Sequence, residues 1–99
     1  MKKFTSSERS NGELAVRRMS KKAQEAYSDT DLIGVYEYVD EGASYEAEQK
    51  AEAEGKDYFP GELDVVLYAV DYDGTIDNGL TFEEAEKWLE DFADALTEA

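Results

Sequence analysis

The strongest hydrophobic patterns in the chain are two short apolar runs and one long amphipathic segment. Residues 32–39 and 64–72 are rich in β-branched and aromatic side chains, which is typical of strands, although the first run would also suit one face of a helix. The second run begins apolar on both faces, so we expect it at the centre of a sheet. Residues 82–97 repeat apolar side chains at helical spacing, and Thr81 with Glu84 predicts a capping box at the start of this helix.

Two further helices are expected before and between the strands. Ser10 and Glu13 also have the spacing of a capping box, and they predict one helix over residues 11–27. Residues 43–54 favour a surface helix, because their apolar face consists only of alanine. Residues 73–80 are polar and rich in turn residues, so we assign them to a loop.

These elements predict a single α+β domain. It would span residues 10–99, after a flexible basic tail over residues 1–9. We expect a small antiparallel sheet of two or three strands packed with three helices, in the order α-β-α-β-α.

Composition narrows the classes of function. The 99 residues include no Cys and no His, and 12% of them are aromatic, enough to build a folded core. Without imidazole and thiol groups, the commonest general base, nucleophile and zinc ligands are missing, so we expect no enzyme and no cofactor. No apolar run approaches the roughly 20 residues of a membrane span, and the N-terminus does not resemble a secretion signal, so the chain reads as cytoplasmic.

Charge is both large and unevenly distributed. The net charge is −15, yet residues 1–22 carry seven of the ten basic residues and only two acids. The remaining residues, 23–99, hold 23 acids and three lysines. Such an excess attracts a basic protein partner and repels nucleic acid and anionic membrane, whereas a role in solubility alone is the simpler alternative.

The basic residues near the N-terminus fall on one face of the predicted helix over residues 11–27. We expect this face to dock on the acidic surface, within the monomer or across a dimer, which makes a homodimer through this helix a further hypothesis. The four basic residues are Arg17, Arg18, Lys21 and Lys22.

Acidic side chains cover one broad arc of the helix predicted over residues 82–97, with only Lys87 among them. Like charges one helical turn apart repel, so a merely solvated helix would mix in more lysines. Rows of carboxylates resemble the charged edge of nucleic acid, and an exposed Tyr45 or Tyr58 would add contacts to arginine. The candidate partner-binding residues are Glu37, Asp40, Glu41, Glu46, Glu48, Glu52, Glu83, Glu86, Glu90, Asp91 and Asp94.

The segment after the second apolar run resembles the first motif of haloacid-dehalogenase-type phosphatases. An apolar strand is followed by Asp71, then Asp73, Gly74 and Thr75. The resemblance implies that Asp71 is a nucleophile and Asp73 a general acid. Only 26 residues follow Asp73, too few for the later strands of that family, so we interpret the motif as a turn after a strand.

The same segment also follows the spacing of a calcium-binding EF-hand loop. Oxygen ligands would come from Asp73, Thr75, Asp77 and Glu84. Asn78 stands where that loop has glycine, and a strand precedes the loop in place of a helix. Since Glu84 is also explained by the capping box, calcium binding is a lesser alternative.

In size, acidity and α+β pattern the chain resembles phage- and plasmid-encoded inhibitors of bacterial defence, namely anti-CRISPR and antirestriction proteins, several of which mimic DNA. The resemblance implies a host nucleoprotein or nuclease in the bacterial cell as target, blocked by steric and electrostatic competition for its nucleic-acid-binding surface. Bacterial immunity proteins and antitoxins, which neutralise basic toxins, are the main alternative.

Overall fold

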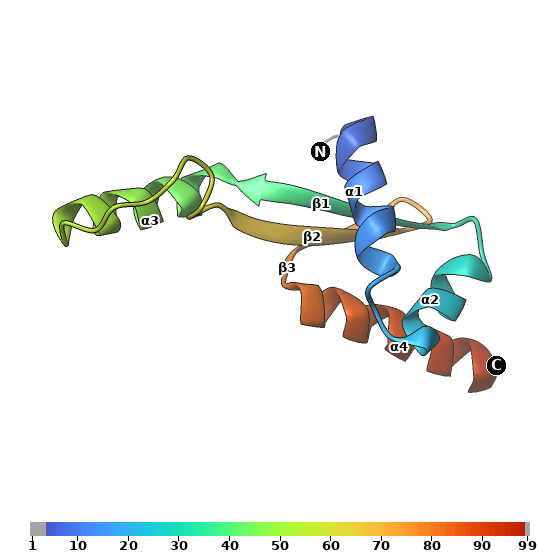
Figure 1. Ribbon diagram of the computed structural model, residues 1–99. Helices are drawn as coiled ribbons and strands as arrows, with labels where there is room; N and C mark the ends of the chain where they lie inside the picture. Colours follow the sequence, from blue (N-terminus) through green and yellow to red (C-terminus); the bar gives the residue numbers. More distant parts are fainter. Residues whose placement is uncertain (1–3, 99) are drawn as a thin grey trace.

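The computed structural model describes residues 4–98, with the side chains of residues 4–95. Within this range the chain forms a three-stranded sheet with four helices (Figure 1), one helix more than the sequence predicts. The fold class is therefore α+β, as expected. The elements are α1 (Ser6–Val16), α2 (Lys21–Ser28), β1 (Ile33–Asp40), α3 (Glu41–Ala53), β2 (Val65–Tyr72), β3 (Thr75–Leu80) and α4 (Phe82–Glu98).

The sheet is antiparallel in the order β1-β2-β3, which confirms the central position of the second predicted strand. The third strand corrects the assignment of residues 73–80 to a loop. Asp73 and Gly74 have φ values of 51° and 87°, so they form the two-residue turn of a hairpin that returns the chain along β2. The polar pattern hid β3 because this edge strand is largely exposed.

Helices α2 and α4 cover one face of the sheet (Figure 1). Val35 and Val70, which are opposite each other in β1 and β2, are fully buried on this face. Leu89 of α4 is fully buried with them. The small side chains of Ala23, Ala26 and Ala85 let the two helices approach closely. Most of the apolar core lies at this end of the molecule.

The expected single helix over residues 11–27 is wrong, because the chain forms α1 and α2 with a break between them. The capping box at the start of α1 uses Thr5 and Glu8 rather than Ser10 and Glu13, so residues 6–9 are helical, whereas residues 1–3 of the expected tail lie outside the described residues. Ser20 caps α2, where its hydroxyl accepts a hydrogen bond from the Ala23 amide. The break allows both helices to turn buried residues towards one core.

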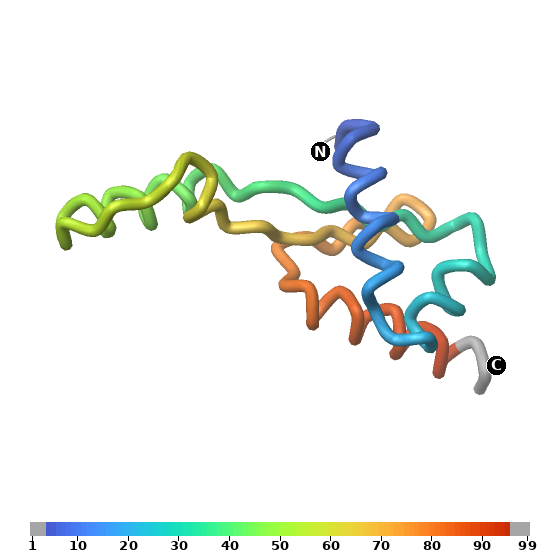
Figure 2. The backbone as a smooth tube through the Cα atoms, viewed as in Figure 1, coloured from blue at the N-terminus to red at the C-terminus, as the bar shows by residue number. Residues whose placement is uncertain are grey.

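Helix α3 and the chain that leads from it to β2 (residues 41–64) form a projection that we call the arm. The arm extends from one end of the sheet, away from α1, α2 and α4 (Figures 1 and 2), and the molecule measures 54 × 26 × 18 Å. Ser44 anchors it: its hydroxyl donates to the Asp40 carbonyl oxygen and accepts from the Val65 amide, both at 2.7 Å. Asp40 caps α3 through the Ala43 amide.

Candidate partner-binding surface

Two acids of α4 that were expected to face a partner instead hold helix α2. Glu86 accepts a hydrogen bond from the Ser20 amide, and Glu90 accepts one from the Ser20 hydroxyl, each at 2.8 Å. Both carboxylates lie at the N-terminus of α2, where the free amides and the helix dipole favour negative charge. They therefore join two helices and are not free for a partner.

The other acids on α4 are also engaged, or lie apart from one another. Asp94 forms an ion pair with Lys22, which raises the pKa of Lys22 above its ordinary value, chiefly through the hydrogen bond to Asp94. Asp91 forms an ion pair with Lys87, with 3.5 Å between Oδ1 and Nζ. Glu83 is exposed at the start of the helix. The acidic arc of α4 is thus largely paired within the chain.

The basic residues do not share one helical face, because Arg17 and Arg18 lie in the break and only the two lysines lie in α2. The guanidinium Nη2 of Arg18 lies 3.7 Å from the carboxylate Oε2 of Glu37. The same guanidinium group lies over the ring of Phe82, with its carbon 5.5 Å from the ring centroid. Together with the pair between Lys22 and Asp94, this contact shows docking of basic on acidic side chains within the monomer.

The arm carries many of the remaining acids. It holds eight acidic residues and two lysines, a net charge of −6. At about 100° per residue, Glu41, Tyr45, Glu48 and Glu52 fall within about 60° of one another on α3, and we call these four residues the acidic stripe. Tyr45 is 62% exposed, which leaves its ring open to a partner between the carboxylates.

Few contacts inside the protein occupy the acidic stripe. Among the side chains that the structure describes, none forms an ion pair with Glu41, Glu48 or Glu52. Glu52 accepts a hydrogen bond of 3.0 Å from the Tyr58 hydroxyl, and this bond is the main reason that the pKa of Tyr58 is raised. Glu46, the remaining candidate on α3, is exposed at a different angle of the helix.

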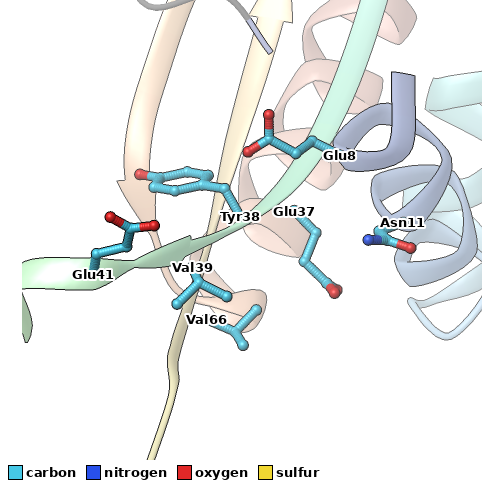
Figure 3. Close-up of a pocket in the computed structure, with 7 residues that line it drawn as sticks. All are labelled: Glu8, Asn11, Glu37, Tyr38, Val39, Glu41 and Val66. Atoms are coloured by element: carbon cyan, nitrogen blue, oxygen red, sulfur yellow. The ribbon is translucent and has the colours of Figure 1, made fainter. Parts of the chain in front are cut away.

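A shallow pocket lies between the arm and α1, beside the outer edge of β1 (Figure 3). Val39 and Val66 contribute apolar side chains, and Glu8, Glu37 and Glu41 also line the pocket, with Glu8 on the side of β1 to which Tyr38 points. Glu37 is already partly engaged, because it accepts a hydrogen bond of 2.9 Å from the Tyr68 hydroxyl. The pocket joins the start of the acidic stripe to the body of the protein.

The two motifs of the hairpin after β2 occupy a different region. Asp71 accepts a hydrogen bond of 2.9 Å from the Gly74 amide, so this carboxylate supports the turn. Thr75 and Asp77 lie in β3 rather than in a loop, and Glu84 caps α4 through the Thr81 amide, as the capping box predicts. Among the described residues, no group of three or more Asp and Glu side chains is placed to hold a metal ion.

Sequence reasoning missed four residues of this surface. Glu8 and Asn11 were assigned to a tail and to a different helix start, and Val39 and Val66 look like ordinary core positions of a strand. Their position depends on where α1 crosses β1, which no local pattern reveals.

Within the described part of the chain, no helix combines the length and the apolar character needed to cross a membrane. Comparison of the chain with family models, with curated proteins and with solved structures found no match.

Proposed function

We propose that this protein uses the acidic stripe on its arm to bind the nucleic-acid-binding surface of a basic partner, and so blocks nucleic-acid binding by steric and electrostatic competition. The observation that carries the proposal is a row of carboxylates on a projecting helix without ion-pair partners among the described side chains. A groove rich in Lys and Arg would supply those partners. The partner class is the one that the family resemblance implies, a host nucleoprotein or nuclease.

The acidic stripe suits arginine in particular. A guanidinium group stacked on the exposed ring of Tyr45 would gain a cation–π contact of about 0.5–2 kcal/mol. From that position it would reach the carboxylates of Glu41 and Glu48, which are four residues before and three residues after Tyr45. Arginine pairs with carboxylates through two parallel hydrogen bonds, which fixes orientation as well as affinity.

The proposed mechanism is occupation of a surface and involves no catalytic residue. A net charge of −15 raises the rate of encounter with a basic groove and repels the competing nucleic acid. The narrow arm extends well beyond the helices that cover the sheet (Figure 2), which suits entry into a groove. The same net charge would drive association with any basic surface, so the stripe must supply the specificity.

Capture from bacterial lysate at low salt tests the proposal, with three forms of the protein as bait. The first is the wild type, and the second carries Glu41→Lys, Glu48→Lys and Glu52→Lys on the acidic stripe. The third is a control of equal net charge with Glu25→Lys, Asp29→Lys and Asp31→Lys, three exposed acids outside the arm. Circular dichroism verifies that each variant is folded, and mass spectrometry identifies the captured proteins.

We expect the wild type and the control to capture the same nucleic-acid-binding protein, and the stripe variant to lose it. Equal loss in both variants would show that net charge alone drives binding and would contradict a role for the stripe. Capture of a small basic toxin, in place of a nucleic-acid-binding protein, would favour the function of an immunity protein or antitoxin.

A further inference from the structure

Between α1 and the arm, no described strand pairs with the outer edge of β1, and the ring of Phe4 packs on Tyr36 and Tyr38 on one face of this strand. In the described part of the chain, β1 pairs only with β2, along its inner edge. Helix α1 crosses the outer edge, where Gly12 contacts the backbone of Val35. Beyond that crossing, two neighbouring hollows lie along residues 37–41. Four strand residues at about 3.3 Å each span about 13 Å, enough to pair with a short extended segment.

Near this edge the sheet also exposes apolar side chains, whereas the equivalent side chains elsewhere in the sheet are buried. Val39 and Val66 are opposite each other in β1 and β2 and are 42% and 41% exposed. Val35 and Val70, the equivalent pair under the helices, are fully buried. The two faces of the strand differ here, because Tyr38 points to one side of β1 and Val39 to the other (Figure 3).

The charges around this edge select the occupant. Glu8, Glu37, Asp40 and Glu41 line the two hollows, and no basic residue lines either of them. A second copy of this chain paired edge to edge would bring these carboxylates against their own equivalents, which is unfavourable. A basic segment would be attracted, and charged edge strands are a known device against pairing with the wrong chain.

We infer that an extended basic segment of the partner adds to the outer edge of β1 over residues 37–40 as a fourth strand. Its apolar side chains lie on Val39 and Val66, and its alternate Lys or Arg side chains lie on the opposite face, beside Asp40. Backbone hydrogen bonds of this kind supply affinity, and alternate side chains supply specificity. The inference rests on the proposed basic partner and adds the way in which that partner is recognised.

A short synthetic peptide of alternating lysine and valine, capped at both ends, is the direct probe. Titration is followed by the amide resonances of the ¹⁵N-labelled full chain, and affinity is measured by calorimetry. We expect the largest shifts at residues 37–40. Two further peptides of equal charge carry N-methyl groups on alternate peptide nitrogens, one set for each edge of the peptide. One of them should bind at least about tenfold more weakly, because it loses the hydrogen bonds to β1.

A pair of variants tests the apolar contact separately. Val39→Thr with Val66→Thr retains β-branched side chains and should weaken binding of the unmodified peptide about tenfold. Leu32→Thr is the control, since Leu32 is exposed just before the opposite end of β1, and it should leave affinity unchanged. Affinity that is unaltered by N-methylation of either edge, or by the two valine substitutions, would overturn the edge pairing.

The outcomes separate this inference from the proposed function. If both N-methylated peptides bind as well as the parent peptide, attraction by charge remains and only pairing with β1 is refuted. If no basic peptide binds even at low salt, the acidic surface does not recognise basic segments, and both the inference and the proposed function are contradicted. Association of the protein with itself that shifts the amide resonances of residues 37–40 would place a second copy at this edge and would also overturn the inference.

Discussion

Gly12 determines how closely α1 approaches β1. A Cβ atom at this position would lie 2.1 Å from the carbonyl oxygen of Val35 and 2.7 Å from the amide nitrogen of Tyr36, both backbone atoms that no side-chain rotation can move. The contact lets α1 cover one part of the strand edge, and no described strand pairs with the part over residues 37–40. A single residue type therefore helps to define the proposed site.

Gly12→Ala should destabilise the fold by about 3 kcal/mol or more, because α1 has to move away from β1. Chemical denaturation measures the effect. Gly42→Ala is the control, since the nearest atom to its Cβ would be a side-chain oxygen of Asp40 at 3.6 Å, an ordinary contact distance. Similar stability of the two variants would show that α1 does not pack on β1 as described.

Tyr68 links stability to alkaline pH. Burial, and then its hydrogen bond to Glu37, raise the pKa of Tyr68 above its ordinary value of 10. The folded state thus holds the phenolic proton more tightly than the unfolded state does. This contribution to the free energy of unfolding is complete below pH 10 and is lost as the pH rises through the raised pKa.

We expect the free energy of unfolding of the wild type to fall above pH 10, and that of Tyr68→Phe to fall less steeply, as measured by urea denaturation at a series of pH values. The raised pKa values of Tyr27 and Lys22 contribute to the fall in both proteins. Parallel curves for the two proteins would contradict the role assigned to Tyr68.

Between elements, the contact of α2 with α4 depends on carboxylates that point from one helix to the start of the other. Glu86 and Glu90 occupy the N-terminus of α2, and Asp94 pairs with Lys22 one turn further along α4. Charge on α4 thus positions a helix that covers the sheet.

Glu86→Lys should lower the free energy of unfolding by about 2 kcal/mol, because a hydrogen bond to a charged group is lost and a positive charge is placed at a helix N-terminus. Glu25→Lys makes the same change of charge at an exposed position of α2 and should alter stability by about 0.5 kcal/mol or less. Urea denaturation compares the two variants, and equal losses would contradict this account of the helix contact.

Elements with strong local signals were predictable. Strands β1 and β2 and helix α4 follow from their apolar periodicity, and the capping box of Thr81 and Glu84 places the start of α4 correctly. The start of α1 was not predictable, since Thr5 with Glu8 and Ser10 with Glu13 have the same spacing. Only packing on the sheet selects one of the two starts.

The candidate site was predicted in composition but not in position. At about 100° per residue, Glu86 and Glu90 flank the apolar stripe of α4, about 60° and 100° from Leu89, but this spacing does not show that α2 packs beside that helix. Asp73 and Gly74 are a typical hairpin pair, yet the polar residues after them gave no strand pattern. These errors share one cause, which is that tertiary neighbours decide the role of an exposed residue.

For the whole molecule, shape and charge act together. The elongated body places the arm, with its net charge of −6, at one end, so most of the apolar core and the acidic stripe lie in different parts. Self-repulsion of like charges opposes folding, and salt screens it.

Raising the NaCl concentration from about 20 mM to about 300 mM should therefore raise the melting temperature, because the Debye length falls from about 20 Å to about 6 Å. Differential scanning calorimetry measures the change. A melting temperature that falls with salt would mean that the ion pairs between α2 and α4 outweigh the repulsion within the rest of the chain.

The most direct test of the central claim is competition between this protein and duplex DNA for the captured partner, measured as a function of salt concentration. We predict that the protein displaces DNA at low salt, that its affinity falls linearly with salt on logarithmic axes, and that the variant with the three reversed charges on the acidic stripe does not compete. Simultaneous binding of DNA and this protein to the partner, or competition that is indifferent to salt, would contradict the claim.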